Sequence, residues 1–289
     1  MQKLSERYIA GPELKDARAA VRGINAEGKM ATIDVLGEEI TNEEEAAAIV
    51  RAYQDVFADI QRCGLDSNVS VKPTALGLKL GYDLCRENLR VVVEDAAARR
   101  NFVRIDMEDS STTDETLRVY RELREDGLDN LGIVLQAMLR RTPADIRAVA
   151  HLKPSVRLCK GIYVESPEIA YEDYEAVRAS FVRCLEDLLD AGCYVGIATH
   201  DEWLLDVARR LVSKRGLSAD QYEFQMLLGV RSELGNQLVR EGHRLRIYVP
   251  FGRHWYAYSL RRLQENPKIA GYIAADTLGR LIGRRNGSS

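Results

Sequence analysis

Short apolar runs rich in β-branched residues recur eight times along this 289-residue chain, and they constrain its fold more than any other feature. Segments with helical periodicity separate the runs, for example residues 42–63 and 174–192. Strands that alternate with amphipathic helices predict crossover units and a parallel sheet. The eight predicted strands lie at residues 30–37, 69–73, 102–108, 132–137, 155–161, 194–200, 223–227 and 244–250.

Eight such units predict a closed (β/α)8 barrel of the α/β class, a fold that typically takes about 250 residues. An open doubly wound sheet is the alternative, but the chain lacks the G-x-G-x-x-G sequence that marks nucleotide-binding members of that class. We therefore expect a helical arm over residues 1–28 and a barrel over residues 29–266. A short helix and a frayed tail are expected over residues 267–289.

The composition argues against several other classes of protein. A formal charge of -3, from 41 basic and 44 acidic residues, gives no broad basic surface for nucleic acid. The five cysteines and four histidines lack zinc-site spacings, so we expect no metal and reduced thiols. No apolar run approaches the roughly 20 residues of a membrane span. We expect a cytoplasmic protein, with contact to a membrane surface left open.

Polar side chains gather at the predicted strand ends, where barrel enzymes carry their catalytic residues. A single polar group at a strand end is most often structural. Seven strand ends of this kind converging on one rim instead predict a binding or catalytic mouth. These residues are Lys72, Asp106, Gln136, Arg157 with Lys160, Thr199 with His200, Gln225 and Tyr248.

The segment "WYAYSLRRLQEN", residues 255–266, follows the last predicted strand. Its residues Tyr258, Arg261, Arg262 and Glu265 fall at helical spacing and share one face. Base rates favour a solvent-exposed face for such side chains. The alternative is a site for a small anionic substrate, because a guanidinium pairs with a carboxylate through two charge-assisted hydrogen bonds.

The residues alone leave the chemistry open. A lysine at a strand end, Lys72 or Lys160, also fits a Schiff-base lyase or aldolase. A barrel that binds a metabolite without transforming it is a third interpretation, and the converging ionisable groups argue against it.

Several motifs together resemble those of proline dehydrogenase in its short monofunctional bacterial form: "VRLCKGIY", "IATHD", "EFQMLLGV" and "YSLRRLQEN". The resemblance covers most of the chain. It implies a distorted (β/α)8 barrel that holds FAD noncovalently at its mouth, with a final helix across that mouth. It also implies oxidation of L-proline to 1-pyrroline-5-carboxylate by hydride transfer to FAD, with electrons passed to membrane quinone.

The same resemblance assigns roles to the candidate residues. Lys72 is similar to the substrate-site lysine, Asp106 to the carboxylate that pairs with it, and Arg157 to a cation near the flavin N5. Arg261 and Arg262 would clamp the substrate carboxylate, with Glu265 holding their guanidinium groups. The pyrrolidine ring would lie among Tyr258, Leu227 and Tyr248. FAD contacts are implied for Met107, Gln136, Arg157, Lys160, Gly161, Ile162, Thr199 and His200.

Two positions depart from the family pattern. Ile162 stands where alanine is commoner, and Cys159 where valine is commoner, so pocket volume is in doubt more than chemistry. The resemblance also implies peripheral contact with the inner face of the membrane, and it leaves open a pyrroline-carboxylate dehydrogenase that receives the product.

Overall fold

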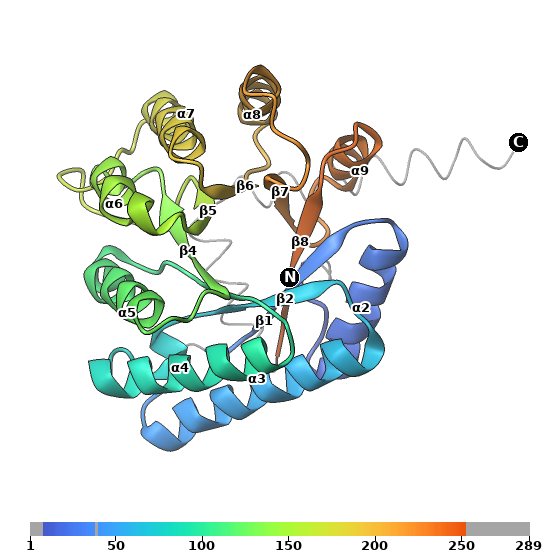
Figure 1. Ribbon diagram of the computed structural model, residues 1–289, viewed down its shortest axis with the longest axis vertical. Helices are drawn as coiled ribbons and strands as arrows, with labels where there is room; N and C mark the ends of the chain where they lie inside the picture. The colour runs from blue at the N-terminus through green and yellow to red at the C-terminus, as the bar shows by residue number, and fades with distance from the viewer. Residues whose placement is uncertain (1–7, 38–39, 253–289) are drawn as a thin grey trace, which may run out of the picture.

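The computed structural model describes residues 8–37 and 40–252, and within them eight parallel strands close into a barrel in chain order. Each strand pairs with its neighbours in sequence, and β1 pairs with β8 to complete the ring (Figure 1). The strands are β1 Met30–Val35, β2 Ser67–Val71, β3 Val103–Ile105, β4 Leu131–Gln136, β5 Ser155–Cys159, β6 Tyr194–Ala198, β7 Tyr222–Leu227 and β8 Leu245–Phe251.

Helices form an outer ring around the barrel (Figure 1). Their apolar positions recur at helical spacing, as Val50, Tyr53, Phe57 and Ile60 do along one buried face of α3. The α-helices are α2 Leu14–Ala26, α3 Glu43–Cys63, α4 Tyr82–Ala98, α5 Thr113–Glu125, α6 Thr142–Val149, α7 Tyr174–Asp190, α8 Glu202–Lys214 and α9 Ser232–Arg240. Short 3-10 turns are η1 Thr74–Leu76, η2 Ser110–Thr112 and η3 Ala150–Leu152.

Side chains alternate between the two faces of each strand, and this alternation separates the core from the site. On β1, Ile33 and Val35 belong to the apolar core, whereas Thr32 and Asp34 make polar contacts inside the barrel. On β3, the buried Arg104 alternates in the same way with Val103 and Ile105. The apolar core therefore lies between strands and helices, and the barrel interior is polar.

Helix α2 precedes the first strand but packs against both β1 and β8. In Figure 1 it lies in the outer ring beside β1 and β8, with α3 as its neighbour. A regular barrel places the helix that follows β8 at this position. The N-terminal helix thus covers the part of the wall that a helix after β8 would otherwise cover.

The predicted barrel is confirmed, and all eight observed strands overlap the predicted runs. None of the described helices is both long and apolar enough to cross a membrane. The final helix and the tail predicted after β8 lie outside the described residues.

Candidate active site

Asp106 follows the last residue of β3 and accepts hydrogen bonds from three side chains. Arg157 Nη1 lies 2.7 Å from its Oδ1 and Ser70 Oγ lies 2.8 Å from the same oxygen. The hydroxyl of Tyr248 donates to its Oδ2 over 3.0 Å. Four strands, β2, β3, β5 and β8, therefore contribute side chains to one buried carboxylate.

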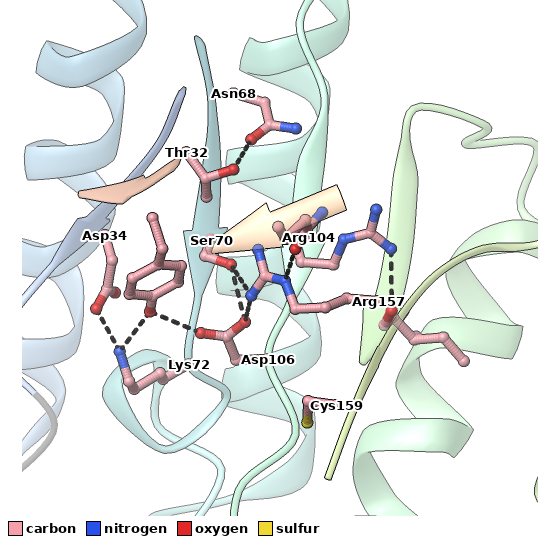
Figure 2. A network of polar contacts seen from close by, with 12 residues as sticks. Thr32, Asp34, Asn68, Ser70, Lys72, Arg104, Asp106, Arg157 and Cys159 are labelled. Atoms are coloured by element: carbon pink, nitrogen blue, oxygen red, sulfur yellow. Dashed lines mark hydrogen bonds and ion pairs between the residues drawn. The ribbon is translucent and has the colours of Figure 1, made fainter. Parts of the chain in front are cut away.

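Lys72, one residue beyond β2, is almost wholly buried and pairs with Asp34. Its Nζ lies 2.6 Å from Asp34 Oδ2 and 3.5 Å from the hydroxyl of Tyr248. Burial alone would lower the pKa of Lys72, but Asp34, Tyr248 and Asp106 together outweigh it, so the pKa lies well above its usual value. Figure 2 shows Lys72 reaching Asp34, with Asp106 beside Ser70.

The pairing of Lys72 with Asp106 that the family resemblance implies stays a prediction, and Asp106 is among the charges that raise the pKa of Lys72. Lys72 pairs with Asp34, while the carboxylate of Asp106 pairs with Arg157. The hydroxyl of Tyr248 connects the two pairs, because it donates to Asp106 and lies within reach of the Lys72 amine. The result is two neighbouring ion pairs, each made of one cation and one carboxylate.

Arg157 lies on β5 and is held on two edges of its guanidinium group. Nε donates to Gln225 Oε1 over 2.5 Å, and Nη1 donates to both Asp106 and Ser70. The guanidinium carbon also lies 5.2 Å from the centre of the Tyr248 ring. Among the described residues, Nη2 makes no hydrogen bond.

Lys160, one residue beyond β5, belongs to a second charged cluster around Asp201. Its Nζ lies 2.5 Å from Asp201 Oδ2 and 4.4 Å from the centre of the Tyr174 ring. Arg178 and Tyr174 also donate to Asp201. Burial would raise the pKa of Asp201, but hydrogen bonds from Arg178, Lys160 and Tyr174 hold it far below its usual value.

Thr199 and His200 follow β6 and link it to the end of β7. The backbone N–H of Leu227 donates to His200 Nε2 over 3.0 Å, and Asp201 N–H donates to Thr199 Oγ1. Burial and the nearby Arg231 and Lys160 lower the pKa of His200 to about 4. His200 is therefore neutral near pH 7, with its proton on Nδ1.

The remaining predicted contacts lie around the same rim. The side-chain amide of Gln136, at the end of β4, donates to the Glu108 carbonyl. Gly161 has φ +105°, a conformation that favours glycine, and a Cβ there would displace the side chain of Met138. Ile162 and Leu227 pack against a small apolar cluster of Tyr8, Ile9 and Leu36. Met107 belongs to the main core cluster.

The four residues of the predicted carboxylate clamp, Tyr258, Arg261, Arg262 and Glu265, lie outside the described residues. Their arrangement around a substrate therefore stays a prediction.

Sequence reasoning missed two residues that complete the site, Asp34 and Ser70. Both occupy alternate polar positions inside apolar runs, Thr32 and Asp34 in "MATIDVLG" and Ser70 and Lys72 in "VSVKP". Because successive side chains of a strand point to opposite faces, polar residues two apart lie on the same face. This alternation could have identified the inward-facing side chains below each strand end.

A (β/α)8 barrel with buried, paired ionisable groups from several strands at its mouth defines the class: this is a barrel enzyme. The chain belongs to the proline dehydrogenase family, whose sequence model matches residues 17–274. It is 37% identical to proline dehydrogenase 1 of Bacillus subtilis subsp. natto over 93% of this chain and 89% of that protein. It is 35% identical to proline dehydrogenase of Deinococcus radiodurans over 96% of this chain and 91% of that protein.

Solved structures show the same fold. Proline utilization A from Bdellovibrio bacteriovorus, inactivated by N-propargylglycine, superposes with a TM-score of 0.85 at 25% identity. That match covers 92% of this chain but only 33% of the other, so this chain spans about a third of that protein. The family resemblance predicted from the sequence motifs is confirmed.

Proposed function

We propose that this protein oxidises L-proline to 1-pyrroline-5-carboxylate, using FAD as the hydride acceptor and a membrane quinone as the final electron acceptor. The observation that carries the proposal is the clustering of Lys72, Asp106, Arg157 and Tyr248 at one barrel mouth in a chain of this family. FAD, when bound, supplies the two-electron chemistry. The residues of this chain would then bind and orient the substrate and the flavin, and neutralise the charge that develops.

The described residues fit a flavin dinucleotide. A diphosphate requires cations or N–H groups, and Lys160 and Arg178 both contact Asp201, the N-cap residue of helix α8. Glu175 also pairs with Arg178, so the charges of this cluster balance, and the helix N-terminus supplies the additional attraction for a phosphate. The Nδ1–H of His200 adds a neutral donor, and Gly161 keeps side-chain bulk away from the loop after β5.

Arg157 is suited to the electron-accepting end of the flavin. Two of its nitrogens are held by Gln225, Asp106 and Ser70, which directs the remaining Nη2. A cation fixed before the reaction stabilises negative charge that develops as hydride arrives, and it does so without reorganising. In this proposal Gln136, Thr199, Met107 and Ile162 line the rest of the flavin site.

Tyr248 and Leu227 are suited to the wall around the proline ring, since they lie on the neighbouring strands β8 and β7. Asp106 already receives three hydrogen bonds. It therefore acts as a fixed negative charge near the substrate nitrogen and not as a base that moves toward the substrate. Lys72 is kept charged beside it by Asp34.

The carboxylate clamp of Arg261 and Arg262, with Tyr258 and Glu265, completes the proposal from outside the described residues. Two observations support it. The described charges at the mouth form balanced pairs, so an anionic substrate needs further cations. Helix α2 also covers the wall beside β8, which favours a final helix placed across the mouth.

A Schiff-base lyase is disfavoured at Lys72. A lysine nucleophile must lose its proton, and such lysines have depressed pKa values. The pKa of Lys72 is instead raised by its buried neighbour Asp34.

The product would be consumed by a pyrroline-carboxylate dehydrogenase. Support comes from relatives named as bifunctional PutA proteins, of which this chain matches about a quarter. Delivery of electrons to a membrane quinone would bring the protein to the inner face of the membrane as a peripheral protein in the cytoplasm.

Anaerobic reduction tests the proposal. The purified protein is saturated with FAD, and L-proline is added under argon while the absorbance of the oxidised flavin is followed. We expect bleaching by L-proline and none by D-proline or glycine. An Asp206→Asn variant, altered in an exposed helical ion pair, should reduce at the parent rate. Failure to bind FAD, or a bound flavin that L-proline leaves oxidised, would overturn the proposal.

A further inference from the structure

A chain of buried hydrogen bonds runs from Arg157 down into the barrel. Arg157 Nε donates to Gln225 Oε1 over 2.5 Å, and Gln225 Nε2 donates to Glu223 Oε1 over 2.6 Å. Glu223 is itself fixed by Arg246 Nε at 2.7 Å and by the hydroxyl of Tyr194 at 2.9 Å. Strands β5, β6, β7 and β8 thus join in one network below the mouth.

The chemistry of this network fixes the orientation of the Gln225 amide. A guanidinium only donates hydrogen bonds and a carboxylate only accepts them. A group between Arg157 and Glu223 must therefore accept from the first and donate to the second. A primary amide does both, and rotating it by half a turn would set N–H against N–H and oxygen against oxygen.

The neighbouring strand leaves room for that amide. Gly196 lies on β6, in register with Arg157 on one side and Glu223 on the other. A Cβ at Gly196 would meet Gln225 Nε2 at 2.4 Å and Cδ at 2.9 Å, closer than real Cβ atoms approach. A larger residue at this position would therefore displace the Gln225 amide from the place it occupies beside Gly196.

We propose that Gln225 is a positioning residue for hydride transfer, and that Glu223 and Gly196 act through it. The hydrogen bonds that Nε and Nη1 donate together determine the plane of the Arg157 guanidinium. That plane determines where Nη2 points. The inference rests on the proposed function, in which Arg157 faces the reacting end of the flavin.

Two substitutions at Gln225 separate positioning from packing. Gln225→Met conserves volume but offers Arg157 no acceptor. We expect flavin reduction by proline to slow by about tenfold to a hundredfold, as a misplaced catalytic group does. The Kd of tetrahydrofuran-2-carboxylate should change little, because Arg157 does not hold the substrate carboxylate. Gln225→Glu keeps an acceptor for Nε. Flavin reduction in this variant should therefore be at least about tenfold faster than in Gln225→Met, whatever its melting temperature.

Two variants elsewhere provide the comparison. Gly196→Ala changes no hydrogen-bonding group but forces the Gln225 amide aside, so it should slow reduction as Gln225→Met does. Thr32→Val is the matched control. It removes a partly buried hydrogen bond to Asn68 inside the same barrel, away from Arg157. It should lower the melting temperature and leave the reduction rate unchanged.

A second readout does not depend on proline oxidation. In the FAD-saturated protein, the Nε–H resonance of Arg157, assigned through its loss in Arg157→Lys, should be protected from solvent exchange. Protection should be lost in Gln225→Met and Gly196→Ala and retained in Gln225→Glu and Thr32→Val. If proline fails to reduce the parent flavin, the proposed function fails, while this resonance still tests the positioning. Retained protection or a parent-like reduction rate in Gln225→Met would overturn the inference.

Discussion

Asp34→Asn should destabilise the fold more than any other single-atom change at the mouth, because it removes the partner of a buried cation. Asp34 is fully buried, and its Oδ2 lies 2.6 Å from Lys72 Nζ. At an effective dielectric constant of about 20, that separation corresponds to about 6 kcal/mol of attraction. Removing one partner of a buried pair typically costs about 3–5 kcal/mol, a large part of a typical free energy of unfolding.

The loss should depend on pH with a defined sign. Because the pKa of Lys72 in the fold lies above its unfolded value, the pair contributes fully below the unfolded pKa and is lost only as pH rises through the raised pKa. In Asp34→Asn the attraction disappears while burial remains, so the pKa of Lys72 falls. The difference in stability between parent and variant should therefore be greatest near neutral pH and shrink as the solution becomes more alkaline.

Urea unfolding of the FAD-saturated proteins between pH 7 and pH 10 measures both effects. Asp206→Asn, in an exposed pair with Arg209, is the control and should stay within about 0.5 kcal/mol of the parent. The double variant Asp34→Asn/Lys72→Met should recover part of the lost stability, because it leaves no unpaired charge. A loss below about 1 kcal/mol for Asp34→Asn, or a loss independent of pH, would refute the reasoning.

Three further substitutions test single roles. Arg157→Ala should keep the fold but slow flavin reduction roughly 10²- to 10³-fold in stopped-flow measurements at matched FAD content; an unchanged rate would remove Arg157 from the reaction. Tyr248→Ser should raise kcat/KM for trans-4-hydroxyproline relative to proline about 10- to 200-fold, and a constant ratio would exclude Tyr248 from that wall. Arg262→Met should weaken tetrahydrofuran-2-carboxylate binding at least about tenfold, with little change in melting temperature; unchanged binding would mean that Arg262 faces solvent.

The barrel could be predicted from the sequence because its signals are local. Each strand is a short apolar run, and helix formers fill the segments between runs, so both the number and the order of the units are visible along the chain. The position of helix α2 in the fold could not be predicted in the same way. Its amphipathic pattern predicts a buried face, but only the closure of β8 onto β1 determines which strands that face covers.

The partners of the site residues could not be predicted, and the reason is geometric. The ends of β2 and β3 place Lys72 and Asp106 on the same rim, and the family resemblance implied that the two form a pair. In the barrel, Asp34 on β1 lies in register with Ser70 on β2, one inward-facing position below Lys72. The long lysine side chain can therefore turn back to Asp34, while the shorter Asp106 is held by Ser70 and Arg157. The acid with which a lysine pairs depends on the stagger between neighbouring strands and on how far its side chain extends across them. Neither can be predicted from the sequence of a single strand. The same limit applies to Gln225, whose place at a strand end was evident while its role depends on Gly196 and Glu223 from neighbouring positions.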